Sequence, residues 1–160
     1  IGNTAATLPA NQIMAMPFYV GKPVNVIAVA CHVGSGAGSA NARIGIYNNV
    51  VGSVYPGSLF LNIGQVAIST VGLKNINGFT GSLTGTLYWI AFIKDTVVRM
   101  LSVSGFANWQ IGGAPTSSLI GGTWGARVDA SFSYGSLPAI FPVGQPFVDD
   151  VPPKVALFIP

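Results

Sequence analysis

Hydrophobic and polar positions alternate with a period of two along most of the chain, and no helical pattern extends beyond about two turns. Residues 24–33 show the alternation most clearly. One face carries larger side chains and the other carries small ones with a single histidine: Ile27, Val29, Cys31 and Val33 against Ala28, Ala30 and His32. This pattern predicts a strand, and its small-residue face is one that can accept a neighbouring chain.

Further strands are predicted over residues 42–47, 59–61, 65–69, 73–79, 87–93, 97–103 and 155–159. In residues 42–47, Ile44 and Ile46 point opposite to Arg43, which predicts a short, half-exposed strand. Residues 87–93 are apolar without a break, so both faces of that strand must be covered. Pro56 and Gly57 occupy the central positions that a type II turn prefers. We expect the last strand to lie inside a sheet, next to an early strand.

About eight short strands with few helix formers predict an all-β protein, an antiparallel β-sandwich, and we expect a jelly roll. Residues 16–160 form the expected single domain, preceded by an arm or a link to an upstream segment over residues 1–15. Residues 104–148 lose the strand pattern and are rich in Gly, Pro, Ser and aromatics. A connection of this length is usually functional, so we expect specificity to reside there.

Only 7% of the residues are charged and Glu is absent, whereas 50% are hydrophobic and 21 are Gly. Soluble domains average about a quarter charged residues, so we expect another chain to cover part of this surface, as in a homo-oligomer. The net charge of +3 reflects few acids, and the dispersed Lys and Arg argue against nucleic-acid binding. Residues 44–73 are uncharged, but the Asn, Gly and Pro residues within them argue against insertion in a membrane.

The single Cys31 excludes an internal disulfide and leaves the redox compartment open; within an apolar run it is expected to be a buried, inert thiol. Residues 1–4 lack the basic start and the apolar run of a signal peptide. The absence of an initiating Met leads us to expect a processed product or part of a longer chain.

Catalytic and metal-binding patterns are missing. A Ser/His/Asp triad would need His32, whose apolar strand offers no orienting acid, so we expect a hydrogen-bonded or surface histidine. Glycoside hydrolysis usually needs two carboxyl groups, and only four Asp are available. Asp149 and Asp150 have two interpretations, a Ca²⁺ site with backbone carbonyls or, as we prefer, a solvated turn before Pro152. We therefore expect no enzyme activity, no cofactor and no metal.

The remaining candidate site combines aromatic rings with polar groups. Flat rings stack on the C–H face of a sugar, and amide, guanidinium and carboxylate groups fix its hydroxyls. The candidate glycan-binding residues are Trp109, Trp124, Tyr134, Asn108, Gln110, Arg127 and Asp129. The alternative is that these rings close the end of the sandwich or meet a symmetry mate. Trp89, in the most hydrophobic strand, is expected to pack in the core.

Five short segments, in this order along the chain, together carry a resemblance to a known family. They are residues 16–20 (Met-Pro-Phe-Tyr-Val), 42–47 (Ala-Arg-Ile-Gly-Ile-Tyr), 55–59 (Tyr-Pro-Gly-Ser-Leu), 85–92 (Gly-Thr-Leu-Tyr-Trp-Ile-Ala-Phe) and 153–157 (Pro-Lys-Val-Ala-Leu). Together they resemble a β-sandwich module of tail-fibre and other virion surface proteins of bacteriophages. The resemblance implies an exposed, trimeric module that contacts the host surface or decorates a capsid. The long segment after Val103 departs from that pattern.

The leading hypothesis is a non-enzymatic phage virion structural protein, a homotrimeric fibre head at the particle surface that attaches to a host surface glycan. One alternative is a capsid decoration or minor capsid protein that binds other virion proteins and no glycan. Another is a secreted carbohydrate-binding module, which would be monomeric in solution.

Overall fold

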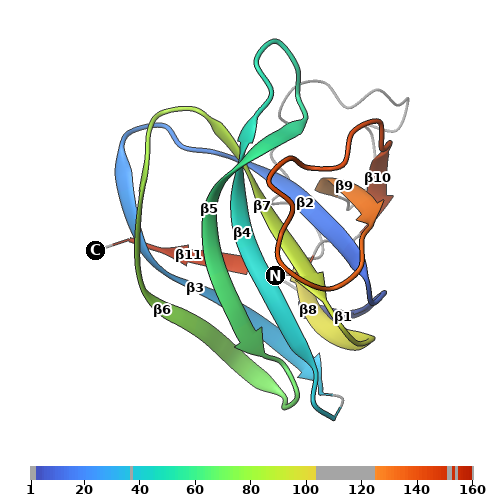
Figure 1. The fold of residues 1–160 in the computed structure, drawn as a ribbon. Coiled ribbons are helices and arrows are strands. Elements are labelled where there is room, and N and C mark those ends of the chain that lie inside the picture. Colours follow the sequence, from blue (N-terminus) through green and yellow to red (C-terminus); the bar gives the residue numbers. More distant parts are fainter. Residues whose placement is uncertain (1–2, 37, 104–124, 151–152, 154, 160) are drawn as a thin grey trace.

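The computed structural model describes residues 3–36, 38–103, 125–150, 153 and 155–159, and within them it contains β-strands and no helix (Figure 1). The strands are β1 Asn3–Leu8, β2 Gln12–Tyr19, β3 Val24–Ser35, β4 Asn41–Asn49, β5 Pro56–Ala67, β6 Gly72–Leu83, β7 Leu87–Lys94, β8 Val98–Val103, β9 Gly125–Ser131, β10 Phe147–Asp150 and β11 Val155–Phe158. The prediction of an all-β chain is confirmed, with more strands than the eight expected.

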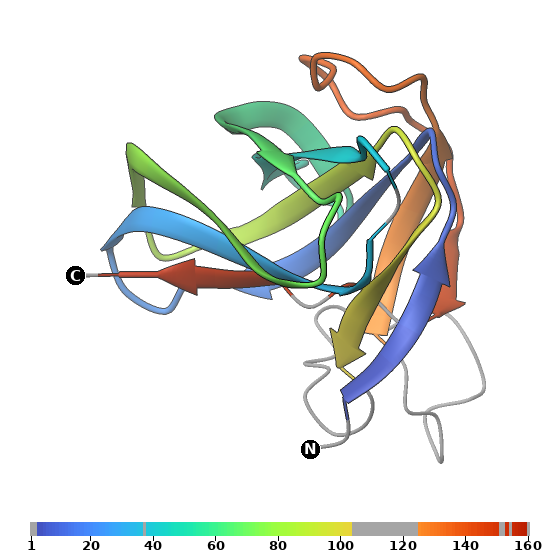
Figure 2. The ribbon, with the colours of Figure 1, turned by 90° about the horizontal axis from the view of Figure 1, so that it is seen from below.

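The strands form two antiparallel sheets that pack face to face (Figure 2). One sheet has the order β1-β8-β3-β11, and β6 pairs with the opposite edge of β3. The other has the order β10-β9-β2-β7-β4-β5. This architecture confirms the predicted antiparallel β-sandwich, while the jelly roll stays a prediction.

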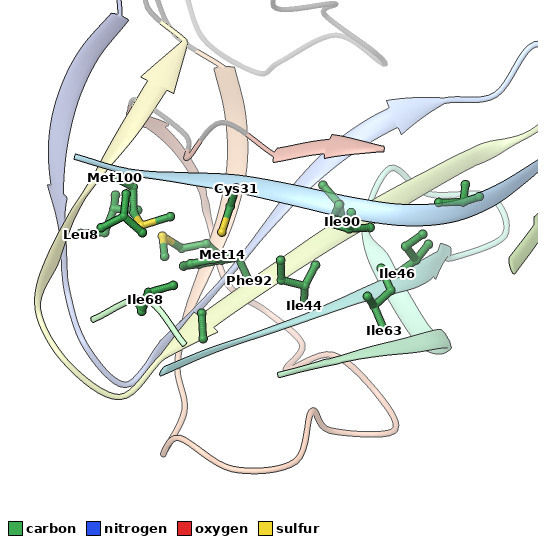
Figure 3. Packing of buried hydrophobic residues seen from close by; sticks show 14 of the residues in the cluster. Leu8, Met14, Cys31, Ile44, Ile46, Ile63, Ile68, Ile90, Phe92 and Met100 are labelled. Carbon is green, nitrogen blue, oxygen red and sulfur yellow. The ribbon is translucent and has the colours of Figure 1, made fainter. Parts of the chain in front are cut away.

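The main core lies between the two sheets and is built from alternate residues of their strands. Figure 3 shows Met14, Cys31, Ile44, Phe92 and Met100 directed into this space, and each is at most 1% exposed. Burial raises the pKa of the Cys31 thiol to about 11, against a small opposing effect of Lys74. The predicted buried thiol is therefore confirmed, and at neutral pH it stays protonated and unreactive.

A second core covers the other side of the six-stranded sheet. The segment that follows β9, residues 132–147, folds across this side and places Leu137 and Phe141 against Tyr47 and Trp89. The Tyr47 hydroxyl donates a hydrogen bond of 2.7 Å to the carbonyl of Pro138, and its ring meets that of Phe141 edge to face. Both faces of β7 are thus covered, and Trp89 is fully buried, as predicted.

The structure corrects two predictions about exposure and loop length. Residues 42–47 are not half-exposed: Ile44 faces the main core, Tyr47 faces the second core, and β4 lies between β5 and β7. Residues 104–148 are not one long loop either, because β9 and β10 fall within them and continue the sheet beyond β2.

The predicted type II turn at Pro56-Gly57 is wrong. Pro56 and Gly57 begin β5, which runs unbroken through the two strands predicted at 59–61 and 65–69. The chain instead reverses over residues 50–55, between β4 and β5. Gly52 there has φ 77°, and the amide of Val50 donates a hydrogen bond to the carbonyl of Tyr55. Pro56 is buried and pairs with Asn49 of β4, so strand pairing takes the place of the turn that these two residues favour locally.

Three further predictions are corrected by strand pairing. A register shift between Val26 and Ala28 turns Ile27 out of the core, where it is 41% exposed. The last strand, β11, does lie beside an early strand, β3, but at the edge of the described sheet. Residues 149 and 150 end β10 instead of forming a turn.

Residues 1–15 were expected as an arm or link, but β1 and the start of β2 fall within them. Strand β1 pairs with β8 in one sheet, and β2 pairs with β7 and β9 in the other. Leu8 and Met14 are buried in the main core and Ile13 is buried in the second core, so β2 contributes both of its faces. From Asn3 onward the segment is part of the sandwich.

Candidate functional site

The structure describes only some of the predicted glycan-binding residues. Asn108, Trp109, Gln110 and Trp124 lie outside the described residues. Arg127 is in β9, where it pairs with Val148, and its side chain is also outside the described part. Asp129 and Tyr134 are described, so the structure shows on which face of the sheet each one lies.

Asp129 and Tyr134 lie on opposite faces of the six-stranded sheet. Asp129 pairs with Met14, whose side chain faces the main core, and is 9% exposed. Tyr134 follows β9 and packs against the second core. The fold therefore separates two residues that the sequence grouped in one site.

Tyr134 belongs instead to a polar corner, which we define as Asn11, Arg43, Asp95 and Tyr134. Asn11, in the turn between β1 and β2, has φ 54°, a conformation that Asn tolerates better than most residues. Its side-chain oxygen accepts a hydrogen bond of 2.9 Å from the Tyr134 amide, and its carbonyl accepts one of 3.1 Å from Phe132. Asn11 thus fixes the chain after β9 to the end of the sandwich.

Asp95, in the turn between β7 and β8, supplies the negative charge of this corner. Its two carboxylate oxygens accept from the Asn41 amide at 2.8 Å and from the Asn41 side chain at 3.1 Å. Burial acts to raise the pKa of Asp95, but hydrogen bonds from Asn41 and Thr96 outweigh it and lower the pKa below its ordinary value. The carboxylate is therefore ionised at neutral pH.

Arg43 and Tyr134 form the centre of the polar corner. The guanidinium carbon of Arg43 lies 5.9 Å from the centre of the Tyr134 ring, within the range of a cation–π contact. Burial raises the pKa of the Tyr134 hydroxyl, and the nearby Arg43 charge partly offsets this effect. Arg43 Nε and the Tyr134 hydroxyl are shielded from solvent, and hydrogen bonding between the two side chains also acts to lower the Tyr134 pKa.

Shielded polar atoms in proteins nearly always have a partner, and here the two groups lie beside each other, so each is the first partner of the other. A guanidinium donates and a phenol both donates and accepts, which suits a ligand rich in hydroxyl or carboxylate oxygens. Sequence reasoning included Tyr134 but missed Arg43, Asn11 and Asp95. The available signal was Arg43, a lone charge in the apolar pattern of β4.

His32 lies on the outer side of the five-stranded sheet, away from the polar corner. It is partly buried, and its Nδ1 has no hydrogen-bond partner within the described part of the chain. No group of three or more potential metal ligands occurs among the described residues. No described helix has the length and apolarity that crossing a bilayer requires.

Comparison with known proteins identifies no relative: no family model, no curated protein and no solved structure matches the chain. Functional inference therefore depends on the residues and their arrangement.

Proposed function

We propose that the chain is a non-enzymatic structural module of a virion surface, a homo-oligomeric fibre head, with a trimer favoured, that attaches to a host surface glycan. The viral setting comes from the resemblance of the sequence to phage fibre modules. The low charge of the chain supports a surface shared with other subunits.

The observation that carries glycan attachment is the Tyr134 ring beside the Arg43 guanidinium at the polar corner. Arg43 offers a planar donor, Tyr134 offers a hydroxyl beside an aromatic face, and Asp95 offers an acceptor nearby. This combination of a ring with convergent polar groups is typical of sites that bind sugars. Trp109 and Trp124, which lie outside the described residues, stay the proposed stacking platform.

Binding of the purified protein to an array of bacterial surface polysaccharides tests this function. We expect Tyr134→Phe, which keeps the ring and removes the hydroxyl, to weaken binding about fivefold, the effect of about one hydrogen bond. Lys22→Gln is the matched control, since it changes an exposed group outside the polar corner, and it should bind like the wild type.

Two results would redirect the proposal. An array on which the folded wild type binds no glycan would favour a capsid decoration protein that contacts only virion proteins. Binding that Tyr134→Phe leaves unchanged, while Trp109→Ala or Trp124→Ala abolishes it, would move the site away from the polar corner and into the aromatic segment.

A further inference from the structure

The two sheets of the sandwich are covered unequally. Residues 132–147 cover the outer side of the six-stranded sheet, whereas no described residue packs over the outer side of the five-stranded sheet. Residues that pair directly across antiparallel strands point to the same side, so the strand pairings define the members of this outer face. They are Leu73, Asn75 and Asn77 of β6, Ala28, Ala30 and His32 of β3, Leu101 of β8, and Ala156 and Phe158 of β11.

The outer face combines projections with a recess. Leu73 is 59% exposed and Phe158 is 46% exposed, although both are large apolar side chains. Between them lies a hollow of about 150 Å³, with Ala30 and Ala156 among the residues that line it. Ala30 is only 1% exposed, so it forms the floor of the hollow below the larger side chains. A surface with apolar projections beside an apolar recess is suited to interlocking contact.

The chemistry of the outer face is compatible with its own copy. The members around the hollow include no Asp, Glu, Lys or Arg. Arg99 of β8 alternates with the core residues Val98 and Met100, so it points to the same side as Leu101 and borders this uncharged area. Asn75 and Asn77 are exposed, and each amide both donates and accepts hydrogen bonds, which makes them complementary to themselves.

The edge of this sheet is the four-residue strand β11, whose short length limits pairing with another chain but which has no other edge protection. Exposed edge strands normally carry a charge, a proline or a bulge that prevents pairing with another chain. Strand β11 has none of these within Val155–Phe158, and among the described residues it pairs only with β3. Leu157 and Phe158 point to opposite sides of this strand, so both of its sides are apolar.

We propose that the outer face of the five-stranded sheet is the contact surface for a second copy of this chain. The inference rests on the proposed homo-oligomer and assigns its interface; a face that meets its own copy makes a two-fold contact, so this interface favours a dimer over the trimer. Burial of Leu73 and Phe158 against the neighbouring subunit explains how a chain with so few charged residues is accommodated in water.

Light scattering on purified variants tests this interface. Because a face that meets its own copy forms a two-fold contact, we expect the wild type to have twice 16.5 kDa, and Leu73→Lys and Phe158→Lys to have the mass of one chain. Both positions are exposed in one subunit, so the folded sandwich tolerates a lysine there, which circular dichroism checks. The matched control is Val51→Lys, which adds the same charge at a 99% exposed valine between β4 and β5 and should keep the wild-type mass.

Folded outer-face variants that keep the mass of a wild-type multimer would overturn this interface and leave the proposed function standing. A monomeric wild type would overturn the interface and the homo-oligomer together. Glycan binding is measured separately through Tyr134→Phe, so its failure is distinguishable from either result.

Discussion

Lys94 shows how a single residue connects distant parts of the sandwich. Its side chain is completely buried, and its Nζ donates hydrogen bonds to the carbonyls of Leu8, Pro9 and Thr96, the latter two at 2.9 and 3.0 Å. These bonds join the turn after β1 to the turn after β7. In the sequence Lys94 precedes Asp95 and resembles an ordinary turn residue, because its three acceptors are backbone groups that no side-chain pattern reveals.

The burial of Lys94 predicts a rise of stability with pH. Burial lowers the pKa of Lys94 from 10.5 to about 8, with a smaller opposing effect of Asp95. Between these values the unfolded chain binds more protons than the folded one, so the free energy of unfolding increases with pH. We expect a gain on the order of 1 kcal/mol from pH 8 to pH 9, measured by urea denaturation. Lys94→Met should remove this rise.

Cys31 limits the pH range of that measurement. Burial raises its pKa from 9.0 to about 11, so above pH 9 the folded chain retains a proton that the unfolded chain loses, and this effect offsets the rise due to Lys94. Burial also raises the pKa of Tyr47 above its ordinary value of 10.0, which acts in the same direction at higher pH. In Cys31→Ala the gain due to Lys94 should therefore extend beyond pH 9. Equal pH slopes for the wild type and Lys94→Met would contradict this account.

At the scale of elements, Asn49 organises the connection between β4 and β5. Its side-chain oxygen accepts from the indole nitrogen of Trp89 at 2.9 Å and from the amide of Tyr55 at 3.1 Å. Its amide donates to the carbonyls of Val50 and Ser53. One side chain thus holds the turn closed and supplies the partner that the buried indole requires.

We expect Asn49→Ala to lower the free energy of unfolding by about 3 kcal/mol, because it leaves the buried Trp89 nitrogen unpaired and removes the bonds that close the turn. Asn48→Ala is the matched control: Asn48 makes one exposed hydrogen bond, to Ser58, and should cost well under 1 kcal/mol. Chemical denaturation at one protein concentration compares the two. An equal loss from both variants would show that the turn does not depend on Asn49.

Strands with a clear hydrophobic pattern were predictable from the sequence. The segment that covers them from a distant part of the chain was not. The unbroken apolar run 87–93 predicted a strand covered on both faces, which Trp89 and Phe92 confirm. The sequence did not reveal what covers the second face, because residues 132–147 have no period and dock through separate contacts such as that of Tyr47 with Pro138. Pro56 and Gly57 predicted a turn from local preference alone, but pairing of β5 with β4 makes them the start of a strand.

At the scale of the whole molecule, the candidate site was only partly predictable. Tyr134 was predicted, but Arg43 joins it from β4, far away in the sequence, and Asp129 is turned toward the main core by its pairing with Met14. Spacing along the chain cannot report which face of a sheet a residue occupies when the sheet's order is unknown. The small outer side of β3 was read correctly from Ala28 and Ala30, since alternation within one strand fixes its own two sides.

If copies of the chain associate through the outer face, unfolding is coupled to dissociation, and the thermal midpoint must depend on protein concentration. We expect the midpoint of the wild type to rise by about 2 to 4 °C for each tenfold increase in concentration. Leu73→Lys should unfold at a midpoint independent of concentration, because its added charge prevents burial of the outer face. Val51→Lys should follow the wild type. Scanning calorimetry over a hundredfold range of concentration measures all three, and a constant wild-type midpoint would contradict coupling between subunits and folding.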